Sequence, residues 1–225
     1  MNRRISFLGF LLSVITGIAA TAMAGTPSKL VDRVAVTVGN RAITESRVLE
    51  ELRVTAFLNT EMPKLDAATR RAAADRLVER ILMRREIELT GFIDNSAEAS
   101  KEELEGIRGR FLDEAAFNAA LAEAGITEAQ LRESLAEQTR LLTFIDYRFR
   151  PAVTVSEEQA REFYKAEYPA FWTSLHPGEP RPEFDDARDD VERLLIDRQV
   201  DKQMDEWLAA TREVTRVVYR DEVFK

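Results

Sequence analysis

The chain has few side chains that could carry out catalytic chemistry. It contains one histidine, His176, and no cysteine. A histidine that acts as a general base needs an orienting partner and a nucleophile within reach, and the sequence around His176-Pro177-Gly178 offers no recognisable triad. Because Pro-Gly marks a turn, we predict a turn histidine. We predict no catalytic residue, and the lack of cysteine excludes a thiol nucleophile and a disulfide framework.

Four acidic residues gather near the start of an expected helix, at Asp185, Asp186, Asp189 and Asp190. Zinc rarely binds carboxylates alone, and the spacing lacks the pattern and central glycine of an EF-hand calcium loop. Negative charge is favourable at the positive end of a helix dipole. We therefore interpret these residues as a helix start. The sequence predicts no metal ion and no other cofactor, and it contains no Gly-x-x-x-x-Gly-Lys nucleotide loop.

Aromatic and methionine side chains are the remaining candidates for a binding surface. Four aromatic residues flank a proline-rich stretch, where they either cap a core or form an exposed patch for unfolded chains. Methionine is adaptable and serves both cores and promiscuous surfaces. The residues that we predict to bind a partner chain are Tyr164, Tyr168, Phe171, Trp172, Met62, Met83 and Met204.

Residues 1–24 have the three parts of a secretory signal peptide: a basic start, an apolar run without charge and a small-x-small cleavage site at Ala22-Met23-Ala24. We expect a cut after Ala24 and an exported, periplasmic protein. The alternative is an uncleaved anchor, although the run is short for a spanning helix of about 20 residues. No other segment is apolar enough to span a bilayer.

The charge of the chain excludes some partners. The formal net charge is −8, and the expected leader contains two arginines and no acid, so the remainder is still more acidic. A chain this acidic binds nucleic acid and anionic lipid surfaces poorly. We expect no nucleic-acid partner and no stable membrane insertion once the leader is removed.

Amphipathic helices account for most of the remaining chain. The clearest runs from Asp66 to Thr90, where apolar residues recur every three or four positions and Gly91 follows as a C-terminal cap. Capping boxes begin three others, at Ser100, Thr127 and Ser156. The predicted helices cover about 44–59, 66–90, 100–110, 114–124, 127–149, 156–167 and 184–212. In 127–149, heptad-like spacing links Leu131, Leu135, Leu142, Ile145 and Phe149.

Two strands are expected, one near each end. Val34, Val36 and Val38 alternate with smaller or polar residues, as in a half-buried strand, and 214–220 also has the composition of a strand. A single strand at each end needs a partner. We therefore predict a mainly α fold with a small two-stranded pairing of the N- and C-terminal strands. A single domain would cover 25–225, with a loop at 169–182.

This order of elements resembles the SurA family of periplasmic chaperones. The resemblance rests on the strand–turn–helix sequence 31–46, on 153–164 and on 184–195, and it covers about Lys29 to Tyr219. In that family, parvulin-type prolyl isomerase domains lie between the last two segments. Here only the short loop 165–183 separates them, less than the roughly 50 residues of a self-standing domain. The resemblance therefore implies the helical chaperone module without its catalytic domain.

The resemblance implies an ATP-independent holdase that binds unfolded polypeptides, outer-membrane proteins above all. Two alternatives remain open. The chain could be an adaptor or structural partner of an envelope assembly or isomerase complex, or, more distantly, a peptidyl-prolyl cis-trans isomerase. The missing insertion argues against the enzyme.

Overall fold

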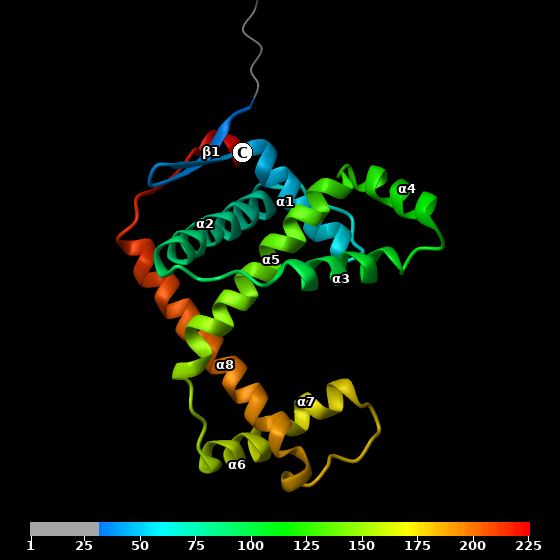
Figure 1. The fold of residues 1–225 in the computed structure, drawn as a ribbon, viewed down its shortest axis with the longest axis vertical. Coiled ribbons are helices and arrows are strands. Elements are labelled where there is room, and N and C mark those ends of the chain that lie inside the picture. The colour runs from blue at the N-terminus through cyan, green and yellow to red at the C-terminus, as the bar shows by residue number, and fades with distance from the viewer. Residues whose placement is uncertain (1–31) are drawn as a thin grey trace, which may run out of the picture. The chain divides into compact units, whose positions relative to one another are not determined.

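A three-stranded antiparallel sheet joins the two ends of residues 32–225, the part of the chain that the computed structural model describes (Figure 1). The strands are β1 (Val34–Val38), β2 (Arg41–Thr44) and β3 (Val217–Tyr219), in the order β2-β1-β3. β1 pairs with β3, so the predicted pairing of the terminal strands is confirmed. The expectation of only two strands is wrong, because the chain turns at Gly39 and pairs again with β1.

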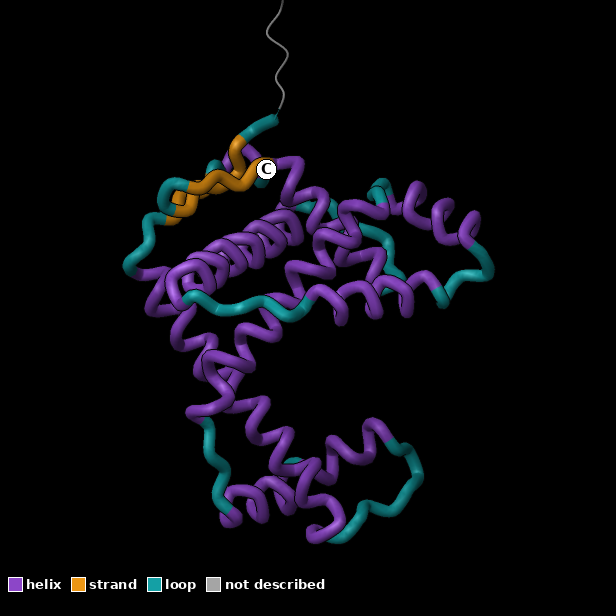
Figure 2. Tube along the Cα trace, in the orientation of Figure 1, coloured by secondary structure: helices purple, strands orange, loops and turns teal. Residues whose placement is uncertain are grey.

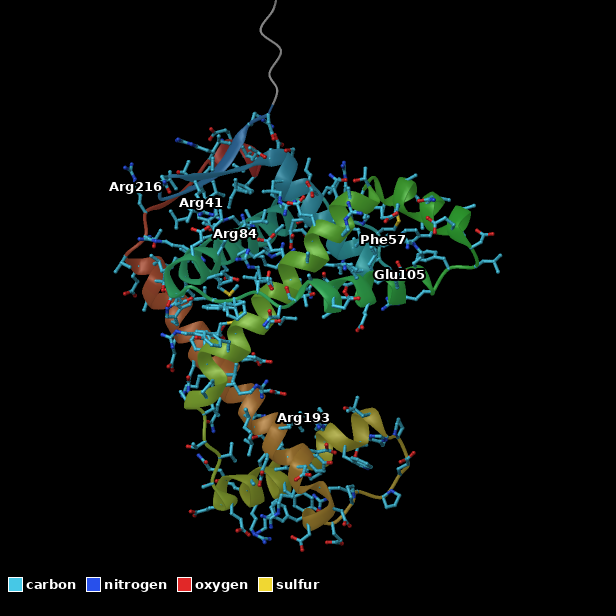
Figure 3. The ribbon with its side chains drawn as sticks, viewed as in Figure 1. Arg41, Phe57, Arg84, Glu105, Arg193 and Arg216 are labelled. Carbon is cyan, nitrogen blue, oxygen red and sulfur yellow. The ribbon has the colours of Figure 1, made fainter. Side chains whose placement is uncertain are left out.

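The turn and the register of this sheet follow from a few residues. Gly39 has φ +59°, a backbone conformation that glycine adopts without a steric penalty. A bulge between Val34 and Val36 shifts the register, so Val34 is exposed while Ala35, Val36 and Val38 are buried. The alternation expected for a half-buried strand therefore holds for Val36 and Val38 but not for Val34. At the turn end, the Gly39 N–H donates to the Arg216 carbonyl at 2.8 Å, and Arg41 and Arg216 lie there together (Figure 3).

Helices make up most of the described chain (Figure 2), and the prediction of a mainly α fold is confirmed. They are α1 (Glu45–Leu58), α2 (Ala67–Thr90), α3 (Ala97–Arg108), α4 (Glu114–Ala124), α5 (Glu128–Phe149), α6 (Glu157–Ala166), α7 (Tyr168–Leu175) and α8 (Phe184–Glu213). Within residues 32–225, no helix combines the length and apolarity needed to cross a membrane. The predicted leader and its cut after Ala24 lie outside the described residues.

Two of the three predicted capping boxes are confirmed. Thr127 and Ser156 each accept a hydrogen bond from the backbone N–H three residues on, and the glutamine there bonds back to the cap. The box predicted at Ser100 is wrong, because α3 begins earlier and the Ser100 hydroxyl donates to the Ala97 carbonyl at 2.9 Å. Asp94 instead organises the turn that leads into α3 by accepting from the Ser96 N–H at 2.9 Å.

The loop predicted over 169–182 is also partly wrong, because its first half forms α7. Pro169 lies in the first turn of that helix, where a missing N–H costs no intrahelical hydrogen bond. The irregular connection begins at His176 and includes Gly178 at φ +85°.

Buried apolar side chains form three clusters. The first lies among the sheet, α1, α2, α5 and α8; the second joins α1, α3, α4 and α5; the third joins α6, α7 and α8. α8 contributes Val191 and Leu195 to the third cluster and Leu208 to the first. This one helix therefore links both regions (Figure 1). Residues 32–225 cluster as one unit, whereas the predicted domain start at residue 25 lies outside the described residues.

A polar network fastens β3 to two helices. The Tyr219 hydroxyl donates to Asp75 on α2, and Arg212 on α8 donates to Asp75 at 2.8 Å and to the Tyr219 oxygen at 2.6 Å. The Arg71 guanidinium lies 3.4 Å from the centre of the Tyr219 ring. Burial, followed by the hydrogen bond to Asp75, raises the pKa of Tyr219 to about 12.

Candidate functional site

A groove of about 490 Å³ opens among residues of α1, α2, α3, α5 and α8. Its walls combine apolar side chains with charged ones. The apolar lining consists of Leu58, Met83, Ile107, Leu141, Leu142, Ile145 and Met204. A surface of this kind can bind apolar side chains of a second chain while its charged rim remains hydrated.

α5 supplies the most accessible apolar side of the groove. Leu141 is buried in the first cluster, whereas Leu142 is 57% exposed. Successive helix residues point about 100° apart, and here the second leucine of the pair turns out of the core into the groove. Ile145, three residues further on, lies on the same side as Leu142 and also lines the groove. The predicted heptad is therefore wrong at Leu142, which faces the groove instead of the core.

The polar wall contains a buried ion pair. Glu51 on α1 is only 4% exposed, and its two oxygens accept from the Arg80 guanidinium at 2.5 and 2.8 Å. Arg76, one turn earlier on α2, lies 3.3 Å from the same carboxylate. A buried carboxylate is tolerated only when it is paired in this way. Glu51 therefore links α1 to α2 in the wall of the groove, and the two arginines balance its negative charge.

Glu79, also on α2, lines the same side of the groove. Burial raises its pKa, and the charge of Arg212 counteracts part of that effect. Among residues 32–225, no basic side chain lies within 4.0 Å of the Glu79 carboxylate. Glu79 accordingly gains a proton at a higher pH than an ordinary glutamate, and the groove becomes less negative as the pH falls.

The structure brings two of the predicted binding residues together at this groove. Met83 and Met204 both line it, although Met83 is largely buried and Met204 is partly buried. Met62 lies elsewhere, beyond the end of α1, and is 77% exposed. The three methionines therefore do not form one surface.

The four predicted aromatic residues lie together on α6 and α7, apart from the groove. Tyr164 and Tyr168 are buried in the third cluster, and Trp172 packs against it. The Tyr164 hydroxyl donates to the Pro182 carbonyl at 2.6 Å. Of the four aromatic side chains, only Phe171 is exposed. In this conformation the four therefore offer a partner chain little surface.

Sequence reasoning missed the groove itself. The residues that define it come from five helices, and only their packing brings them together. One signal was available in the adjacent pair Leu141-Leu142, because a strict heptad places only one of two neighbouring positions in its apolar seam. Among residues 32–225, no group of three or more histidine, aspartate or glutamate side chains is placed to hold a metal ion.

The family described as the SurA-like N-terminal domain matches residues 3–143, which include α1 to α4 and most of α5. The chain belongs to the SurA-like N-terminal domain family. Four of the five helices that line the groove therefore lie wholly or largely within the SurA-like match, and α8 lies beyond it. No curated protein matches the chain. Between α6 and α8, where SurA-type chaperones carry isomerase domains, the structure has α7 and a short connection.

Proposed function

We propose that this protein is an ATP-independent periplasmic chaperone that holds unfolded polypeptides, outer-membrane proteins in particular, at the groove among α1, α2, α3, α5 and α8. The observation that carries the proposal is the open apolar wall of Leu142, Ile145 and Met204 on a SurA-like helical domain. The predicted leader supports the periplasmic location.

The chemistry of the groove suits an unfolded client. Strands of outer-membrane barrels alternate apolar and polar residues, so an extended chain presents an apolar side chain at every second position. Leu142 and Met204 would contact such side chains in more than one register, because methionine adapts its shape to its neighbours. Binding of the unfolded chain lowers its free concentration and slows its aggregation. We propose no catalytic step, since the segment between α6 and α8 is too short for an isomerase domain.

Light scattering provides the test. A urea-denatured outer-membrane barrel protein is diluted into buffer with the purified protein at several-fold molar excess, and we expect slower aggregation. Leu142→Glu should lose most of this effect because it places a charge in the apolar wall. The matched control is Leu89→Glu, an exposed leucine on α2 outside the groove, which should retain it.

The outcome separates the proposed function from an adaptor role. If the parent protein does not slow aggregation, the holdase proposal fails. Recovery of a single stoichiometric partner in place of a spread of clients would then favour the adaptor. Phe171→Glu tests the predicted aromatic patch separately, and a loss confined to this variant would move the binding surface from the groove to α7.

A further inference from the structure

A second, smaller pocket of about 250 Å³ lies on the other side of the C-terminal end of α1. Phe57 and Phe111 stack there with ring centres 6.1 Å apart and planes 7° from parallel, and Phe57 is labelled in Figure 3 at this end of α1. Met62, Pro63 and α4 complete the apolar lining. Since no lining residue is shared with the groove, the two sites are separate.

The turn after α1 positions the residues at the opening of the pocket. The Thr60 N–H donates to the Phe57 carbonyl at 3.1 Å, and the Glu61 N–H donates to the Ala56 carbonyl at 2.8 Å. This is the Schellman pattern, in which a residue just past the helix adopts a left-handed conformation. Thr60 has φ +57°, and the turn directs the chain so that Glu61 and Met62 line the pocket.

The charged residues that line the pocket are all negative. Glu61 and Glu123 are its only charged lining residues among those described, and both are exposed. Within residues 32–225, neither carboxylate has a basic partner within 4.0 Å. The groove differs, since its lining contains three arginines, Arg76, Arg80 and Arg110, beside its three glutamates. An apolar pocket beneath two unpaired carboxylates complements a chain that is both apolar and basic.

We propose that this pocket takes one large apolar side chain of a bound polypeptide, flanked by lysine or arginine residues that face Glu61 and Glu123. The inference rests on the proposed function, because it names the class of segment that the chaperone prefers. Leu58 and Asn59 line the groove, while Phe57 and Thr60 line the pocket. One extended chain passing around the end of α1 would therefore contact both sites.

Fluorescence anisotropy with three labelled peptides tests the proposal on the purified protein. Each peptide is a Gly-Ser chain with one central residue and two flanking residues on each side. The first carries Phe between lysines, the second Phe between glutamates and the third Ala between lysines. We expect the first to bind at least tenfold more tightly than either of the others, and its affinity to fall as salt is added.

Matched variants locate the binding. Glu61→Gln combined with Glu123→Gln should weaken the Phe-Lys peptide about tenfold, which corresponds to about 1.4 kcal/mol. The control is Glu102→Gln with Glu158→Gln, two exposed glutamates outside the described pockets, and should leave the affinity unchanged. Met62→Ala should also weaken binding, whereas Leu112→Ala, at a neighbouring side chain that is 94% exposed but does not line the pocket, should not.

Each result supports or overturns the inference. Equal affinity for the Phe-Lys and Phe-Glu peptides, or no effect of the Glu61 and Glu123 changes, overturns it. If sedimentation shows a dimer that Met62→Ala dissociates, a second copy occupies the pocket and the inference is also wrong. Light scattering with Glu61→Gln/Glu123→Gln is independent of these tests. If this double variant still suppresses aggregation fully and binds the Phe-Lys peptide as tightly as the parent, the proposed holdase function is retained and only the proposed role of the pocket is wrong.

Discussion

Thr60 is a β-branched residue in a backbone conformation that glycine usually occupies. A left-handed residue costs about 1–3 kcal/mol, whereas glycine costs about 0.4–1 kcal/mol through the greater freedom of the unfolded chain. Thr60→Gly should therefore raise the free energy of unfolding by about 1 kcal/mol, measured by urea denaturation. Thr55→Gly, inside α1, is the control and should lower it by at least about 0.3 kcal/mol, the difference in helix propensity between threonine and glycine. A destabilised Thr60→Gly would mean that the threonine side chain makes contacts that outweigh the strain.

At the scale of single elements, Thr127 in α5 and Ser100 in α3 should respond differently to the same kind of substitution, because only Thr127 caps its helix. Thr127 is a true N-cap with a reciprocal box, and Thr127→Ala should lower the free energy of unfolding by about 1 kcal/mol. Ser100 lies inside α3 and bonds only to Ala97 of its own turn, so Ser100→Ala should cost less than about 0.5 kcal/mol. Equal losses in thermal or urea unfolding would show that α3 starts at Ser100 after all.

The short strand β3 depends on a titratable group. Tyr219→Phe removes the hydrogen bond that the hydroxyl donates to Asp75 and the one that it accepts from Arg212. It should lower the free energy of unfolding at pH 7 by about 1–2 kcal/mol. The folded pKa of Tyr219 is raised to about 12 from the ordinary 10. The stabilisation by the hydroxyl is therefore fully present below pH 10 and is lost as the pH rises towards 12, because the unfolded tyrosine ionises first.

The measurement compares both proteins over this pH range. Urea unfolding of the parent and of Tyr219→Phe should differ by a constant amount below pH 9, and the advantage of the parent should disappear between pH 10 and 12. If the parent remains more stable than Tyr219→Phe by the same amount at pH 12, the assignment is wrong, because the contribution of the hydroxyl is then not linked to its ionisation.

Most elements could be predicted from the sequence because their signals are local. Asp66 and Gly91 bound α2, and Thr127 and Ser156 cap their helices as expected. β2 and α7 were missed for physical reasons. β2 has four residues and its last one, Thr44, also caps α1, while Pro169 suits the first turn of a helix as well as a loop. The candidate site was mostly beyond prediction, since Met83 and Met204 meet only through the packing of α2 and α8.

At the scale of the whole molecule, α8 is the connection between two buried clusters. Its N-terminal half packs with α6 and α7, and its C-terminal half packs beneath the sheet. Lys202 lies between these halves with its side chain exposed. Lys202→Pro should break the helix there at a cost of about 3 kcal/mol and separate the unfolding of the two regions. Lys202→Ala should leave them coupled.

The two tryptophans of the chain report these regions separately. Trp172 packs against the third cluster and Trp207 against the first. In proteins that keep only one of them, the other being replaced by phenylalanine, fluorescence should show coincident urea midpoints. With Lys202→Pro, the midpoints should diverge. Divergence before the proline is introduced would show that α8 does not couple the clusters.

The central position of β1 has a consequence for how the protein is made. Its partner β3 lies roughly 180 residues later in the chain, so any product that ends before Val217 contains β1 and β2 but not the third strand. A two-stranded hairpin is marginally stable on its own. Such a product cannot complete the sheet, and the edge of the central strand β1 stays unpaired and open to proteases and to other chains.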